Sequence, residues 1–179
     1  WSVQESANEI LSDIRTRTKD LPERAFVRIY AASCGDIVAR HLEDMCTMLP
    51  FADVEVVAIN PASNPQLLKP YAKWGLRIVT PIMKVFCHAI GFLSCIPCIP
   101  STGSWHSLML LTDQWLAIAY SDAPHKTDLT TGAIISSQDE FLVNEEVCEY
   151  FSGVRIIEVN AGHADVQNHP IEFADACQL

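Results

Sequence analysis

The segment FVRIYAASCGDIVARH, residues 26–41, decides how this sequence is interpreted. Residues 26–32 are rich in branched and aromatic side chains and predict a short strand. Residues 35–49 place apolar side chains at helical spacing and predict a helix that follows at once. Between them, Ser33 is a favourable helix N-cap residue, and Asp36 stands where it closes a capping box. The segment is therefore expected to run strand, tight turn, helix.

This arrangement puts Cys34 in the first helical turn. Unpaired backbone N–H groups and the positive end of the helix dipole favour a thiolate at that position. The same N–H groups can stabilise an oxyanion, and Gly35 leaves room for a substrate to approach. Asp36 opposes this interpretation if its carboxylate points at the sulfur. The alternative for Cys34 is a small buried side chain without chemistry, since free cysteines are among the most buried residues.

A second pattern predicts a β-hairpin that carries the partners of such a thiol. Residues 106–111 and 115–120 are two apolar runs separated by Thr-Asp-Gln, which is typical of two antiparallel strands. The hairpin would bring His106, at its start, beside Asp122, just after its end. A carboxylate fixes the tautomer of an imidazole, which can then activate a thiol. The sequence thus predicts a catalytic triad of Cys34, His106 and Asp122, against the alternatives of a strand-end histidine and a turn-forming aspartate.

Three pieces, Ser33–Cys34–Gly35–Asp36, Trp105–His106 and Trp115 through Asp122, resemble the papain-like and transglutaminase-like cysteine enzymes, in particular bacterial effector and toxin deamidases and proteases. The resemblance implies an α+β fold with N-terminal helices and an antiparallel sheet. It implies a thiol protease, glutamine deamidase or transglutaminase that acts on a protein substrate. In that mechanism Cys34 attacks an acyl carbon, His106 carries the proton and Asp122 orients His106. No metal or organic cofactor is expected.

The alternative fold is an α/β thioredoxin-like domain. Strand 26–32, the helix after Cys34 and a strand at residues 54–59 follow the order of that fold, and residues 64–81 resemble the thioredoxin run that ends in a cis-proline. Ile37 stands where a resolving cysteine is required. Such a chain would be a binding or adaptor module.

Two further motifs carry less information. Cys95–Ile96–Pro97–Cys98 is a lone C-x-x-C, either half a zinc site or incidental loop cysteines. The spacing from Cys34 to Arg40 is that of phosphatase loops, but the glycine-rich interior of such loops is missing.

The remaining periodicity predicts helices, strands and a polar tail. Helices are expected at residues 2–18, 66–74 and 137–151, strands at 79–86 and 154–159, and a poorly periodic tail after residue 160.

The bulk properties indicate one globular domain over residues 1–179. The net charge of -10 argues against nucleic acid as a partner, because phosphate binding requires clustered Lys and Arg. The longest apolar stretch, residues 85–99, is too short to span a membrane. Seven cysteines leave at least one thiol free and favour a reduced chain. The start at Trp1 suggests a fragment or processed form, and the compartment stays open between a secreted effector and the cytoplasm.

Overall fold

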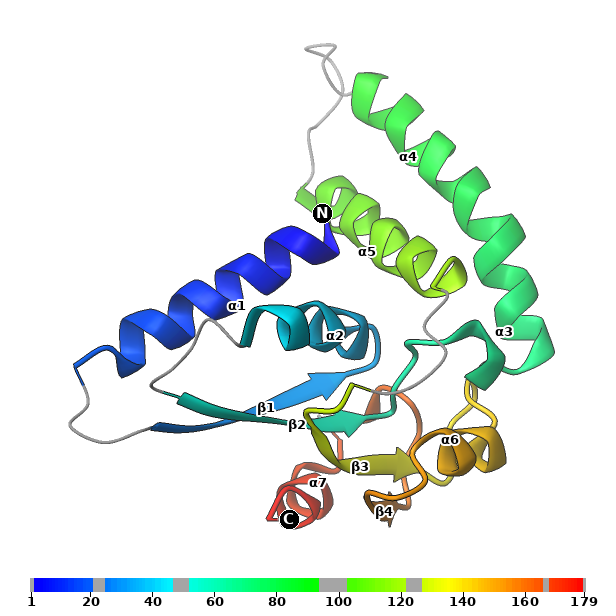
Figure 1. Cartoon of the computed structure of the whole chain (residues 1–179). Coiled ribbons are helices and arrows are strands. Elements are labelled where there is room, and N and C mark those ends of the chain that lie inside the picture. Colours follow the sequence, from blue (N-terminus) through cyan, green and yellow to red (C-terminus); the bar gives the residue numbers. More distant parts are fainter. Residues whose placement is uncertain are drawn as a thin grey trace.

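The computed structural model describes residues 2–20, 25–46, 52–93, 103–121, 127–165 and 168–178. A four-stranded sheet forms its centre, with the strands in sequential order and every neighbouring pair parallel (Figure 1). The strands are β1 (Ala25–Ala32), β2 (Ala52–Ile59), β3 (Thr130–Ser136) and β4 (Arg155–Val159). The predicted antiparallel papain-like sheet is therefore wrong, and the thioredoxin-like alternative is wrong as well. Parallel neighbours require crossover connections, and helices supply them here.

Helices cover both faces of the sheet, which explains why the inner strands are apolar on both sides. The helices are α1 (Val3–Thr18), α2 (Gly35–Cys46), α6 (Asn144–Tyr150) and α7 (Pro170–Ala176). On one face, Ile37 of α2 and Phe151 after α6 pack against Ala58 and Ile135, and α1 packs on α2. On the other face, α7 places Phe173 in the cluster that contains the inner-strand side chains of β2 and β3.

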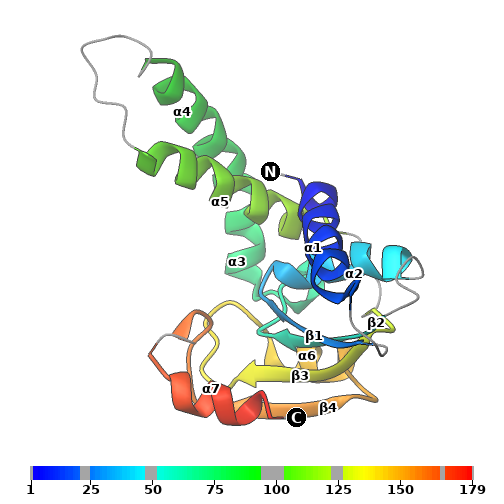
Figure 2. The ribbon, with the colours of Figure 1, turned by 90° about the vertical axis from the view of Figure 1, so that its left-hand side faces the viewer.

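A long helical segment separates β2 from β3. It contains a 3-10 turn (Pro65–Leu67), α3 (Pro70–Trp74), a π-helical turn (Gly75–Val79), α4 (Thr80–Leu93) and α5 (Gly103–Ala119). We call these elements the helical cap. Its α4 and α5 lie against each other and project away from the sheet (Figure 2).

The cap contradicts two predictions. The strand expected at residues 79–86 lies mostly in α4, and the hairpin expected at 106–120 is the helix α5. Both helices carry apolar residues on more than one side. In α5, Leu110 is exposed and Ile118 is buried; in α4, Phe86 is exposed and Cys87 is buried. A helix that is apolar on several sides loses the period of 3.6, so its sequence resembles a buried strand.

Elsewhere the sequence prediction was closer. Strands at 26–32, 54–59 and 154–159 are confirmed, and so is the first helix, whose N-cap Ser2 accepts a hydrogen bond from the Glu5 amide at 3.1 Å. Strand β3 was not predicted, and neither was α7 in the tail. The helix expected from residue 137 begins only at Asn144. Within the ranges given above, no helix is long and apolar enough to cross a membrane.

Candidate active site

Ser33 occupies a sharp turn between β1 and α2. Its backbone has a φ of 50°, a left-handed conformation that is rare for a residue with a side chain, and its amide donates to the Ile59 carbonyl at 2.8 Å. A Cβ placed on Gly35 would lie 4.0 Å from Cβ of Ala31. This distance is an ordinary van der Waals contact, so the unusual backbone of the turn is confined to Ser33 itself. The turn presents the Ser33 hydroxyl at the carboxyl edge of the sheet.

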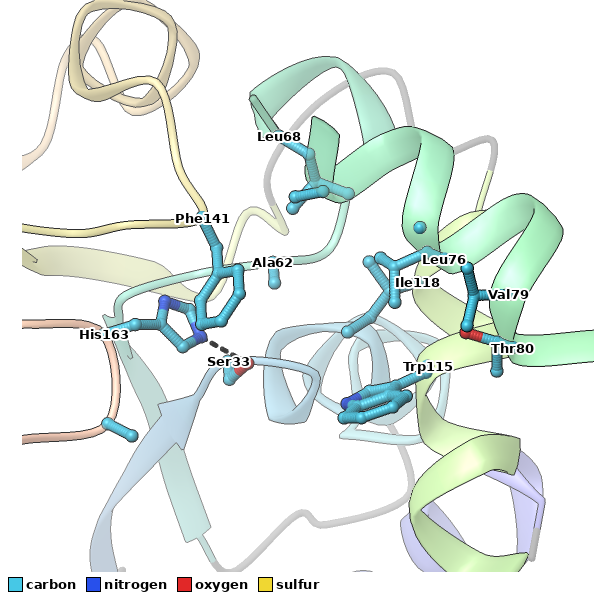
Figure 3. A pocket seen from close by; sticks show the side chains of 13 residues that line it. Ser33, Ala62, Leu68, Leu76, Val79, Thr80, Trp115, Ile118, Phe141 and His163 are labelled. Carbon is cyan, nitrogen blue, oxygen red and sulfur yellow. Dashed lines mark hydrogen bonds between the residues drawn. The ribbon is translucent and has the colours of Figure 1, made fainter. Parts of the chain in front are cut away.

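This geometry corrects the N-cap prediction for Ser33. Its Oγ faces His163, with Oγ and Nε2 separated by 2.9 Å (Figure 3). The other ring nitrogen, Nδ1, lies 2.6 Å from Oδ2 of Asp139. Ser33 follows β1, Asp139 follows β3 and His163 follows β4. Because carboxyl ends of parallel strands meet at one edge of a sheet, the topology brings three distant residues into one hydrogen-bonded relay.

The Asp139 carboxylate is buried and held on both oxygens. Its Oδ1 accepts hydrogen bonds from the backbone amides of Phe141 and Leu142, each at 2.8 Å. These bonds direct Oδ2 at the imidazole of His163. A carboxylate fixed in this way keeps the proton on Nδ1, so that Nε2 is left to accept the proton of a hydroxyl.

The loop that carries His163 is fixed by neighbouring polar groups. The amide of His163 donates to Oε2 of Glu140 at 3.0 Å. The buried Asn60 donates from Nδ2 to the His163 carbonyl at 2.8 Å and accepts from the Ser136 amide through Oδ1 at 2.8 Å. A Cβ on Gly162 would come within 3.0 Å of Asp165 Oδ2. The loop therefore has little freedom to move the imidazole away from Ser33.

An apolar cavity of about 470 Å³ opens beside the Ser33 hydroxyl (Figure 3). The sheet edge contributes Ser33, Ala62, Phe141, His163 and Ala164, and the cap contributes Leu68, Ala72, Gly75, Leu76, Val79, Thr80, Trp115 and Ile118. Its size is that of a small-molecule site. Phe141 also touches the edge of the His163 ring, with ring centroids 5.3 Å apart. The cavity is thus shaped for an apolar group whose reactive end lies at Ser33.

The predicted nucleophile Cys34 is the neighbour of Ser33 in the chain. Its thiol is partly buried, and this burial raises the thiol pKa, which disfavours the thiolate. His106 lies in α5, in place of the hairpin that was expected to pair it with Asp122. The His106 side chain and the whole of Asp122 lie outside the described residues, as do Cys95 and Cys98, so the assignment of Cys34, His106 and Asp122 remains a prediction.

Asp36 and Arg40 have structural partners. The buried Asp36 carboxylate lies 3.5 Å from Arg40 Nη2 instead of closing a capping box, and its burial raises its pKa despite hydrogen bonds from Ser63 and Arg40. Arg40 also bonds Ser63 and the Tyr150 hydroxyl. Arg40, the arginine of the phosphatase-like spacing, is therefore already bonded to side chains within the fold. Among the described side chains, no group of three or more His, Cys, Asp or Glu is placed to hold a metal ion.

Sequence reasoning missed all three residues of the relay. Ser33 was taken for a helix cap, Asp139 was placed in a helix and His163 was assigned to a polar tail. Two signals were present: Ala31-Ala32-Ser33-Cys34-Gly35 matches a strand-to-helix serine turn with alanine in place of its first glycine, and the chain order is Ser, Asp, His.

Comparisons with known proteins agree on the fold. No protein-family model and no curated protein matches the chain. Among solved structures it is similar to RedJ-thioesterase of the prodiginine pathway in Streptomyces coelicolor, with 12% identity, a TM-score of 0.56, and 99% of this chain and 72% of that one covered. It is also similar to the type II thioesterase BorB of the borrelidin cluster, with 14% identity, a TM-score of 0.56 and the same coverage. An α/β-hydrolase-fold protein from Burkholderia ambifaria matches at 14% identity and a TM-score of 0.49, covering 95% of this chain and 70% of that one.

The two similarities with a TM-score of 0.56 overturn the papain-like and transglutaminase-like resemblance, and with it the thiol-protease, deamidase, transglutaminase and toxin expectations. The resemblance failed because it relied on a hairpin that is a helix. A parallel sheet, a serine at a strand-to-helix turn, and an aspartate and a histidine after later strands are the features of this fold. The chain has the fold of the α/β-hydrolases.

Proposed function

We propose that this chain is a serine hydrolase that cleaves a thioester or an ester of an apolar acyl group. One observation carries the proposal: the Ser33–His163–Asp139 relay lies at the mouth of the apolar cavity. A relay of this geometry is recognised by the roles of its residues, whatever their order in the chain. The structural similarity to two thioesterases supports thioester hydrolysis as the reaction.

The chemistry follows from the hydrogen bonds. His163 Nε2 removes the proton from Ser33 Oγ, and Oγ attacks the acyl carbon. Asp139 Oδ2, 2.6 Å from Nδ1, stabilises the imidazolium that forms. The oxyanion can be met by the backbone N–H of Cys34, because the residue after the nucleophile supplies one donor in serine turns of this kind.

The bond to the thiol or alcohol then breaks, and the leaving group takes the proton from His163. Water attacks the acyl-Ser33 ester, His163 accepts one proton from it, and the carboxylic acid is released as Ser33 regains its hydrogen. No redox partner is needed. The acyl chain would lie in the cavity between Leu68, Leu76 and Ile118, where burial of each methylene contributes about 0.8 kcal/mol.

A fluorophosphonate probe tests this proposal directly. The full chain should be labelled at Ser33, as read by peptide mass spectrometry, and labelling should vanish in the variant His163→Ala. Hydrolysis of p-nitrophenyl esters and acyl thioesters of increasing chain length should rise from acetyl to octanoyl. An unlabelled Ser33 together with no hydrolysis of any ester or thioester would contradict the proposal.

A further inference from the structure

The helical cap differs in charge from the rest of the chain. Over residues 65–119 the sequence contains four Lys or Arg residues and one acidic residue, Asp113, which forms an ion pair with Lys84, although the whole chain has a net charge of -10. The four are Lys69, Lys73, Arg77 and Lys84. A local excess of positive charge in an acidic protein attracts an anionic partner.

The outer face of the same segment is apolar and exposed. Residues spaced three or four apart along α3, the π-helical turn and α4 form one stripe: Tyr71, Trp74, Ile78, Ile82 and Val85, with Phe86 beside it. Ile82 is 65% exposed, Val85 70% and Phe86 60%. Isolated exposed apolar residues are ordinary, but a continuous stripe of this kind marks an interaction surface.

The inner face of this helical run already has a role. Ala72, Leu76 and Val79 line the cavity that reaches Ser33. The run therefore has one apolar face toward the cavity and another toward solvent. A partner on the outer face would lie one helix diameter from the cavity.

Cations border the apolar stripe. Lys73 and Arg77, together with Leu68, Pro70, Trp74 and Ile78, line a hollow of about 370 Å³. Long basic side chains can bury their stems against apolar surface while their charges stay in water, and tryptophan and tyrosine prefer the boundary between apolar and polar phases. The hollow thus places positive charge beside an apolar surface, which is the combination a phospholipid head group requires.

We propose that the outer face of α3 and α4 docks on the surface of an anionic phospholipid bilayer. The apolar stripe would enter the boundary between head groups and acyl chains, and Lys73 and Arg77 would contact phosphate groups. Figure 2 shows that α4 and α5 project away from the sheet, so most of α4 lies clear of the sheet and of the helices packed on it. The exposed apolar stripe runs from Tyr71 to Val85, whereas the basic side chains beside it are confined to Lys73 and Arg77. Because the surface is more apolar than charged, it favours a bilayer over a soluble acidic protein.

Vesicle flotation tests this docking with the full chain. The chain should float with vesicles of mixed phosphatidylcholine and phosphatidylglycerol, and less with phosphatidylcholine alone. The double variant Ile82→Glu/Val85→Glu should lower the partition coefficient at least about tenfold, because charge is costly at the lipid boundary. Lys73→Gln and Arg77→Gln should each lower it about fivefold, and added salt should do the same.

The matched control is Ile171→Glu on α7, where the isoleucine is 71% exposed on a helix outside the cap. This variant should float like the unchanged chain. Ser33→Ala should also float like the unchanged chain, because docking does not require the Ser33 hydroxyl. The flotation result can therefore be interpreted even if the chain proves not to be a hydrolase. Absence of flotation with the mixed vesicles, or an equal loss in Ile171→Glu, overturns the proposal. It is also overturned if size-exclusion chromatography shows a dimer that Ile82→Glu/Val85→Glu dissociates while vesicles bind neither form.

Discussion

The sheet edge and the helical cap face each other across one cavity, but the sheet edge is polar and hydrogen-bonded, whereas the cap is mainly apolar. At the sheet edge, polar groups are fixed by short hydrogen bonds: Ser33 to His163, His163 to Asp139, and Asn60 to the histidine loop. The cap contributes mainly apolar side chains to the cavity and leaves others exposed. Under the proposed function, the reaction would depend on the rigid polar edge, and selection of the acyl group would depend on the apolar wall of the cap.

The largest contrast is between two adjacent side chains at the edge. We expect Ser33→Ala to lower kcat/KM for an ester substrate on the order of 10⁴-fold to 10⁶-fold, because the nucleophile is lost. Cys34→Ala should change it less than about tenfold, since only the backbone N–H of Cys34 is required. Steady-state kinetics on both purified variants decide the matter. Equal losses in the two variants would remove Ser33 from its proposed role.

The second contrast tests the carboxylate that orients His163. Asp139→Asn keeps the shape and the oxygen that accepts from Phe141 and Leu142, but it no longer favours the proton on Nδ1 of His163. We expect kcat to fall about 10⁴-fold with the fold intact. Asp175→Asn, an exposed aspartate on α7, is the control and should be silent. A wild-type rate in Asp139→Asn would show that the relay ends at His163.

The sequence predicted the strands of the sheet better than the helices of the cap. Strands 26–32, 54–59 and 154–159 were predicted correctly, because short apolar runs bounded by turns leave few alternatives in a sheet covered on both faces. In the cap, α4 and α5 were taken for strands. Their apolar residues face the cavity, the neighbouring helix and solvent, so no single helical face stands out.

The site was predicted in its local shape but not in its members. A reactive thiol between a strand and a helix was expected at Cys34, and the side chain that we propose to be reactive is that of the preceding residue, Ser33, which is hydrogen-bonded to His163. Its partners Asp139 and His163 lie more than a hundred residues away. Their meeting depends on the order of strands in the sheet, which local periodicity does not contain.

The same substitution, phenylalanine to alanine, should change the free energy of unfolding much more in the core beside the sheet than on the outer face of the cap. Phe151 is fully buried in the main core cluster, whereas Phe86 is exposed on α4. We expect Phe151→Ala to lower the free energy of unfolding by about 3–5 kcal/mol and Phe86→Ala to change it by less than about 0.5 kcal/mol. Urea unfolding followed by circular dichroism measures both. A large loss in Phe86→Ala would mean that the outer face of the cap is packed in solution.

The cap wall should control the length of the acyl group. Ala72→Phe adds a ring to the cavity from α3, so long chains lose space while short ones do not. We expect kcat/KM for an octanoyl ester to fall about 10-fold to 100-fold, because several buried methylenes are excluded, and that for an acetyl ester to stay within about threefold. Ala89→Phe makes the same change at an exposed site on α4 and should alter neither. A parallel loss for both esters in Ala72→Phe would argue that the acyl chain lies elsewhere.

The smallest expected effect concerns Cys34 again, now as a thiol. Because burial raises its pKa above the ordinary thiol value, less of it is thiolate at any pH below that value, and only the thiolate reacts with iodoacetamide. Its labelling should therefore stay slow through neutral pH and rise only in alkaline solution, several-fold behind the exposed Cys148. Mass spectrometry of each cysteine between pH 6 and pH 10 follows this, and His163→Ala should leave the Cys34 profile unchanged, since His163 bonds to Ser33. Fast labelling of Cys34 below pH 7 that depends on His163 would mean that the imidazole activates the thiol. Cys34, in place of Ser33, would then be the nucleophile.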